Sequence, residues 1–174
     1  MGLDITAYTR LHRIEASDIE FDEDGYPLDY DDFIYFGSLA TLHEEYWPGR
    51  AAPFDQDTGA YYDCEDSDGM RAGSYSGYNS WRGLLSGFAD WLLFEHDIYD
   101  AFEEQIEFSD CEGLIGTVVS EKLYNDYVGN RHFLDEYASQ YIEDDETRQW
   151  FIELYDDWTH MFDMGRDNGA VQFH

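Results

Sequence analysis

Two segments of the sequence combine polar side chains of the kinds that bind ligands or perform catalysis. The first, residues 71–82, carries two arginines among hydroxyl and amide side chains: Arg71, Ser74, Tyr75, Ser76, Tyr78, Asn79 and Arg82. The second, residues 108–116, carries Asp110 and Glu112 on either side of Cys111. Neighbouring carboxylates act as metal ligands or as an acid–base pair, and the start of a helix accepts anions. These segments therefore define a candidate enzymatic, metal or small-ligand site.

The spacing of these residues does not match a known catalytic or metal-binding motif. The sequence has no GxxxxGK[ST] phosphate loop. Neither His96 nor His174 stands at a spacing from these carboxylates that is typical of a metal-ligand set. Cys111 lacks the positive surroundings that lower the pKa of a reactive thiol. We therefore expect no metal ion and no cofactor.

A structural role accounts for the same side chains. We expect Ser76 to cap the helix that follows it. A buried arginine needs a carboxylate partner. We therefore expect Asp110 and Glu112 to hold their own loop and to pair with Arg71 or Arg82.

Carboxylates dominate the rest of the chain. The 174 residues include 40 Asp and Glu against 9 Lys and Arg, a formal net charge of -31. Because phosphate neutralisation needs Lys and Arg, this charge argues against direct binding to nucleic acids or to anionic membranes. Solubility and adaptation to high salt are alternative uses of the charge. The single basic cluster, Arg10 with His12 and Arg13, is expected to pair with nearby acids.

Rows of carboxylates are able to imitate nucleic-acid phosphates. B-form DNA carries about one charge per 1.7 Å of axis, and helical residues three or four apart have Cβ atoms about 5–6 Å apart. The acids gather in residues 18–32, 95–112 and 135–157. The side chains assigned to the surface are Asp18, Glu20, Asp22, Glu23, Asp24, Asp29, Asp31, Asp32, Glu103, Glu104, Glu153, Asp156 and Asp157. Such a surface attracts a basic nucleic-acid-binding protein.

Part of this surface also has the spacing of a calcium loop. Residues 20–31 place Gly25 sixth, as an EF-hand loop does, but Glu20 stands first and Asp31 twelfth where that loop has Asp and Glu. Pro27 and the lack of a preceding helix argue further against it. We expect non-specific cation binding here.

The elements that position these residues predict a single α+β domain spanning residues 1–174. We expect a small, mainly antiparallel sheet with packed helices, and a C-terminal half that is mostly helical. The helix at about 78–94 and the last helix should form most of the core, with Gly83 and Gly87 packed closely against another element. Strands are predicted at 3–11, 31–36, 60–64, 70–75 and, as an edge strand, 170–173. Helices are predicted at 38–46, 76–94, 117–128, 130–141 and 144–164, with 97–107 ambiguous and 108–116 a loop.

Two predicted boundaries depend on local turn signals alone. Residues 66–69, Asp-Ser-Asp-Gly, are typical of a turn and predict that 60–64 and 70–75 form a hairpin. Gly129-Asn130 predicts a break between two helices. The longest apolar run, 91–94, is too short to span a membrane. Residues 1–14 lack the apolar run of a signal peptide, and two cysteines do not form a disulfide framework.

Four segments resemble a family of uncharacterised bacteriophage and prophage proteins. They are MGLDITAY at 1–8, RAGSYSGYNSWR at 71–82, FSDCEGLIG at 108–116 and DNGAVQFH at 167–174. They span the chain from end to end. The resemblance implies a phage or prophage gene whose product acts in the cytoplasm of the host bacterium, and it carries no established activity.

These observations predict a non-enzymatic nucleic-acid mimic encoded by a phage. Its acidic surface would inhibit a basic nucleic-acid-binding protein of the bacterium, such as a CRISPR or restriction defence protein. One alternative is an enzyme or a small-ligand or metal-binding protein that uses loops 71–82 and 108–116. Another is a phage accessory protein with neither activity. The target, the oligomeric state and the acidic face used for binding do not follow from the sequence.

Overall fold

The computed structural model describes residues 2–25, 27–28, 33–42, 46–54, 60–108 and 112–174. In this part of the chain the fold is α+β, as predicted, and it contains two antiparallel sheets. The larger sheet has the order β5-β1-β7-β6, formed by Asp66–Ser74, Gly2–Thr9, Ala170–Phe173 and Gly113–Ile115. The smaller has the order β2-β4-β3, formed by His12–Ile14, Tyr61–Asp63 and Ile34–Tyr35.

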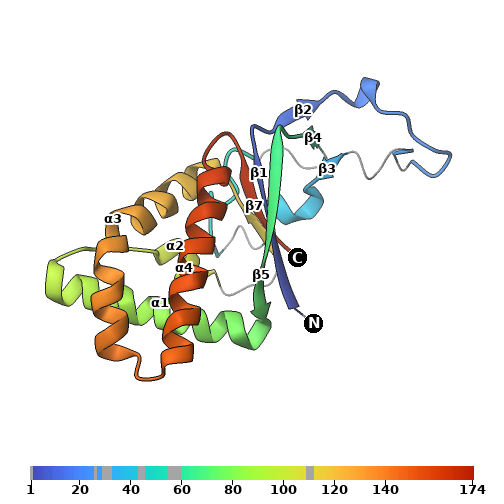
Figure 1. The fold of residues 1–174 in the computed structure, drawn as a ribbon. Coiled ribbons are helices and arrows are strands. Elements are labelled where there is room, and N and C mark those ends of the chain that lie inside the picture. Colours follow the sequence, from blue (N-terminus) through green and yellow to red (C-terminus); the bar gives the residue numbers. More distant parts are fainter. Residues whose placement is uncertain (1, 26, 29–32, 43–45, 55–59, 109–111) are drawn as a thin grey trace.

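Four α-helices are described, and the C-terminal half is mostly helical. They are α1 (Tyr75–His96), α2 (Glu103–Glu107), α3 (Thr117–Tyr141) and α4 (Asp145–Gly165), and the 3-10 helices η1 (Ala16–Asp18) and η3 (Gly37–Ala40) add two short turns. Helices α1, α3 and α4 gather on one side of the larger sheet, and the smaller sheet lies towards its other side (Figure 1). No helix in the described residues is both long enough and apolar enough to span a membrane.

Strand β1 alternates between two environments, as its sequence predicts. Leu3, Ile5 and Ala7 are fully buried against the helices, where Val171 and Phe173 of β7 join them. The residues between them face the opposite side, because successive side chains of a strand point to opposite faces. The sheet therefore has an apolar face under the helices and a more polar outer face.

Aromatic side chains form the centre of the main core, and α1 and α4 supply many of them, as expected. Trp81 of α1 stacks on Trp158 of α4 with ring centroids 5.8 Å apart, and Trp158 stacks on Phe173 at 5.6 Å. Helix α3 adds Tyr127, which is fully buried. Burying so many large rings is the main stabilising contribution that this sequence offers.

The predicted hairpin is wrong in both its turn and its partner. Residues 66–69 are part of β5, which pairs along its whole length with β1, from Thr9 opposite Asp66 to Gly2 opposite Ser74. Strand β4 pairs instead with β2 and β3. The long ladder on β1 satisfies many more backbone groups than a short hairpin would, and so overrides the turn signal.

Four further predictions are corrected. Strand β7 lies between β1 and β6 and is an interior strand rather than an edge strand. The predicted loop 108–116 contains β6. Helix α3 runs without a break through Gly129-Asn130. Residues 38–42 of the predicted helix 38–46 contain only the last turn of η3, and residues 43–45 lie outside the described part of the chain.

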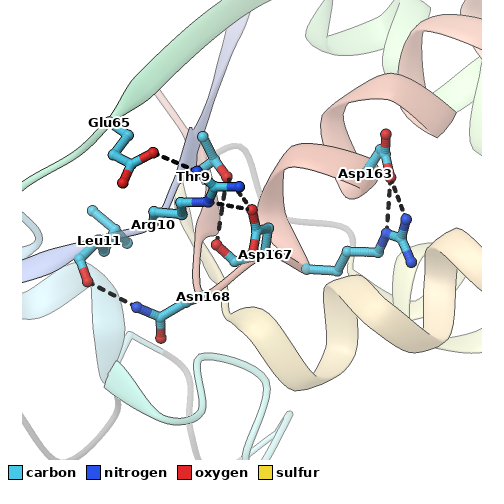
Figure 2. Close-up of polar contacts among 8 residues, drawn as sticks. Thr9, Arg10, Leu11, Glu65, Asp163, Asp167 and Asn168 are labelled. Atoms are coloured by element: carbon cyan, nitrogen blue, oxygen red, sulfur yellow. Dashed lines mark hydrogen bonds and ion pairs between the residues drawn. The ribbon is translucent and has the colours of Figure 1, made fainter.

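A polar junction ties the end of β1 to the segment between α4 and β7. The backbone N–H groups of Arg10 and Leu11 donate to the carbonyls of Asp167 and Asn168, both at 2.8 Å. The Arg10 side chain, at a residue with a φ of 52°, pairs with Asp167 and with Glu65, which directly precedes β5 (Figure 2). The expectation that this basic cluster pairs with acids is thus confirmed for Arg10.

Candidate acidic interaction surface

The first acidic element lies at one end of the molecule. Its described carboxylates are all exposed: Asp18, Glu20, Asp22, Glu23 and Asp24. Apart from η1 and one isolated bridge between Phe21 and Pro27, it has little regular structure. It extends beyond β2, away from the helices (Figure 1). Asp29, Asp31 and Asp32 lie outside the described residues, so the twelfth position of the calcium-like loop does too.

The second acidic element centres on the short helix α2. Glu104 of α2 and Asp126 of α3 both bind Lys122, with 2.9 Å between Lys122 Nζ and Asp126 Oδ2. Burial opposes the charge of Lys122, but its hydrogen bonds to these carboxylates raise its pKa. Glu103 and Glu107 are exposed and are not paired with a cation in the described part of the chain. The element therefore keeps a net negative charge.

Two hollows flank α2 and share Glu103 and Glu107. The first, of about 220 Å³, lies between α1 and α2; its walls are Ala89, Leu93, Ile98 and Ile106 with Asp90 and Asp100 among its acids. The second, of about 190 Å³, is lined by Tyr46, Trp47, Pro48 and Val119, with Arg50 and Glu104. Lysine and arginine side chains place their aliphatic stems on apolar surface while the charge stays near water. Apolar walls beside carboxylates suit such side chains.

The third acidic element is the outer face of α4. Glu153, Asp156 and Asp157 stand three and four residues apart and are exposed. Asp156 pairs with Arg131 of α3 at 2.8 Å, and Glu153 accepts a hydrogen bond from Gln149 at 2.9 Å. Partial burial, followed by the charges of Asp156 and Glu153, raises the pKa of Asp157. Negative charge is thus dense enough here for the carboxylates to disfavour one another.

The three acidic elements do not form one continuous face. The loop that carries Asp22 lies beyond the smaller sheet, far from the connection between α3 and α4 (Figure 1). Helices α2 and α4 belong to the helical side, where both contact α3. A partner that binds the helical acids therefore approaches a different part of the molecule from one that binds the loop.

The polar residues of segment 71–82 have structural roles. Ser74, rather than the predicted Ser76, caps α1: its Oγ accepts a hydrogen bond from Gly77 N at 3.0 Å. Ser76 Oγ lies 3.0 Å from Ser74 Oγ. Ser74 takes the cap because the backbone is already helical at Tyr75. Tyr78 is buried and donates to the carbonyl of Phe108 at 3.4 Å, so segments 71–82 and 108–116 do meet.

Neither Arg71 nor Arg82 pairs with Glu112, and the predicted pairing with Asp110 lies outside the described residues. Arg82 donates to the carbonyl of Ile106 and, at 2.7 Å, to Asn79 Oδ1. The Arg71 guanidinium covers the backbone of Gly2. Within the described residues neither arginine pairs with a carboxylate. Arg82 donates to a main-chain carbonyl and to an amide oxygen instead, and Glu112 is exposed. Asp110, like Cys111, lies outside the described residues.

Sequence reasoning missed a polar hollow on the outer face of the larger sheet. Thr6 and Tyr8 of β1 and Gln172 of β7, followed by His174, line a hollow of about 550 Å³ opposite Asp63 and Cys64. The signal was present in β1, where polar residues alternate with the buried ones. The pairing of β1 with β7, which is distant in the sequence, was needed to bring these side chains together.

Comparisons with known proteins leave this site without a precedent. No protein family, curated protein or solved structure matches the chain. Among the residues that the structure describes, no three or more His, Cys, Asp or Glu side chains are grouped so as to hold a metal ion.

Proposed function

We propose that this protein is a non-enzymatic nucleic-acid mimic that binds and inhibits a basic nucleic-acid-binding protein. The observation that supports the proposal best is the placing of exposed carboxylates on ordered helices, with Glu153, Asp156 and Asp157 on one face of α4. Carboxylates on a packed helix keep a fixed spacing, as phosphates do along a duplex. The basic groove of a partner would therefore bind carboxylates whose positions are fixed before the complex forms.

The helical acids are better suited to this role than the loop acids. The loop at 18–24 is held by a few turn hydrogen bonds rather than by a helix, so fixing its carboxylates against a partner costs more conformational entropy than on α4. The α4 acids are held by a helix whose inner face is buried through Phe151, Leu154 and Trp158. The hollows beside α2 add apolar contact area for basic side chains. We therefore assign the main binding surface to α4 and α2.

The biological setting rests on the resemblance to bacteriophage and prophage proteins. That resemblance implies the cytoplasm of a host bacterium, where a CRISPR or restriction protein would be a suitable target. That step is an analogy from origin and not a consequence of the geometry.

The experiment is an affinity capture from a bacterial lysate, followed by elution with a salt gradient. The expected result is a basic nucleic-acid-binding protein that is released by moderate salt and displaced by added DNA or RNA. Capture of a partner that neither salt nor nucleic acid displaces, or of no partner, would contradict the proposal.

Two matched variants test the assigned surface. Glu153→Gln with Asp156→Asn and Asp157→Asn removes three charges from α4, and Asp22→Asn with Glu23→Gln and Asp24→Asn removes three from the loop. The α4 variant should bind the captured partner at least tenfold more weakly and with a smaller salt dependence. The loop variant should bind as the unmodified protein does. The reverse order would move the binding surface to the loop.

A further inference from the structure

The hollow on the outer face of the larger sheet has the size and lining of a small-molecule site. Ligand pockets commonly occupy about 300–1,000 Å³ and combine apolar walls with a few converging polar groups. This hollow, of about 550 Å³, has Phe33, Ile34 and Tyr35 on one side. Polar side chains from β1, β4, β5 and β7, together with Cys64 and His174, line the rest. It is separate from the acidic surfaces on α2 and α4.

The polar groups are already held in place by one another. Tyr8 donates its hydroxyl hydrogen to Gln172 Oε1 at 3.0 Å, and Thr6 Oγ1 lies 2.9 Å from His174 Nε2. Thr6 faces Gln172 in the β1–β7 register, and these two strands are interior strands of the sheet; His174 directly follows β7. Side chains fixed in this way lose little entropy when a ligand binds.

Gln172 supplies an unused donor in the hollow. The residue is only 8% exposed, and its Oε1 is occupied by Tyr8. Its Nε2 donates no hydrogen bond in the described part of the chain. This nitrogen is open to solvent in the hollow, where a ligand acceptor can replace water. The hollow therefore favours a ligand with a carbonyl or a ring nitrogen.

The charges around the hollow exclude anionic ligands and disfavour covalent chemistry. Asp63 lines it, and neither lysine nor arginine does among the described residues. Burial, followed by the charges of Asp63 and Asp66, raises the pKa of the Cys64 thiol. Because the thiolate is the nucleophile, a raised pKa keeps Cys64 unreactive. The site is suited to binding rather than to catalysis.

We propose that this hollow binds an uncharged planar ligand of the nucleobase class, as a free base or a nucleoside without phosphate. A nucleobase edge carries acceptors for Gln172 Nε2 and N–H donors for the Asp63 carboxylate. Its ring suits the aromatic wall formed by Phe33 and Tyr35. A phosphate group would be repelled by Asp63, and the described lining offers no lysine or arginine to attract it. This function is independent of the acidic surface and does not need the protein partner.

The test is a titration of the full-length, ¹⁵N-labelled protein with uridine, cytidine, adenosine and guanosine, followed by two-dimensional NMR. At least one nucleoside should give saturable shifts at the Gln172 side-chain amide and at the backbone amides of Thr6 and Cys64. Its 5′-monophosphate should bind several-fold more weakly at low salt. The absence of saturable shifts with all four nucleosides up to about 10 mM would overturn the proposal.

Two variants of equal charge localise the site. Asp63 and Asp66 each accept a hydrogen bond from the next backbone N–H, at 2.8 and 2.9 Å, but only Asp63 lines the hollow. Asp63→Asn should weaken binding about tenfold, and Asp66→Asn should leave it unchanged. Gln172→Leu should also weaken it, provided that its spectrum shows an intact fold. Equal affinity in all three variants would place the nucleoside elsewhere and overturn the assignment.

Discussion

At the scale of single residues, two side chains cap the N-termini of the helices that supply most of the core. Ser74 caps α1 through Gly77 N, and Asp144 caps α4 by accepting from Thr147 N at 2.7 Å. The hydrogen bonds from Thr147 lower the pKa of Asp144. Each cap satisfies a backbone donor that the helix itself cannot pair.

The cap on α1 yields a prediction that separates two neighbouring serines. Ser74→Ala should lower the free energy of unfolding by about 1 kcal/mol, because Gly77 N loses its acceptor. Ser76→Ala should have a smaller effect, since Ser76 Oγ contacts Ser74 Oγ and lies within the helix. Urea unfolding of both variants measures the difference. Equal losses would show that the cap is not Ser74.

The raised pKa of Asp157 leads to a prediction about pH. A carboxyl whose pKa is raised by folding stabilises the folded protein below its unfolded pKa, near 3.9, and this contribution is lost as pH rises through the folded value. Asp157→Asn should therefore raise Tm at pH 7 and leave it unchanged near pH 3. Glu146→Gln removes the same charge from the first turn of α4, where acids are favourable, and should not raise Tm. A gain from Glu146→Gln at pH 7 would point to general charge reduction instead.

At the scale of elements, tertiary packing determines the length of α3 in spite of a local signal for a helix end. Gly129-Asn130 is typical of a helix end, yet α3 continues because Tyr127 and Leu134 on either side of it are buried. Asn130 Nδ2 donates to the carbonyl of Asp126 at 2.8 Å, so its amide is used inside the helix. The cost of a helical glycine, about 1 kcal/mol, is smaller than the gain from burying those side chains.

The glycines of α1 and α3 differ in the space that surrounds them, and alanine substitutions test this difference. A Cβ at Gly83 or Gly129 would meet nothing within 4 Å, whereas at Gly87 it would lie 2.5 Å from the Tyr137 hydroxyl. Gly83→Ala and Gly129→Ala should each stabilise the protein by about 0.5–1 kcal/mol. Gly87→Ala should destabilise it by about 1–3 kcal/mol. Thermal unfolding measures all three, and stabilisation by Gly87→Ala would contradict the packing of α1 on α3.

The predictable elements are those whose signal is local and periodic. The alternation of Leu3, Ile5 and Ala7 predicted β1, and the apolar faces of α1 and α4 were legible along the chain. The partners of β5 and the interior place of β7 depend on pairing between distant segments, which one sequence does not encode locally. The acidic surface residues could also be predicted from the sequence, because an exposed charge does not depend on pairing with a distant segment. The hollow beside Gln172 was hidden because it forms only when β1 and β7 pair.

At the scale of the whole molecule, the charge of -31 opposes compactness. Salt screens repulsion between exposed charges, with a Debye length near 30 Å at 0.01 M and 3 Å at 1 M. Raising NaCl from about 0.01 to 1 M should therefore raise Tm. The Glu153, Asp156 and Asp157 triple variant, with less repulsion to screen, should gain less. A Tm that is flat or falls with NaCl would mean that the carboxylates are neutralised in the folded state.

The pairing of β1 with β7 also has consequences for how quickly the molecule forms. Ile5 stands opposite Phe173, so the centre of the sheet closes a loop of almost the whole chain. Contacts so distant along the chain make folding slow. Before β7 docks, β1 has an unpaired edge, and apolar residues such as Leu3 are still exposed to solvent. During that interval the negative charge, which destabilises the folded protein, makes partly folded chains repel one another and so opposes their aggregation.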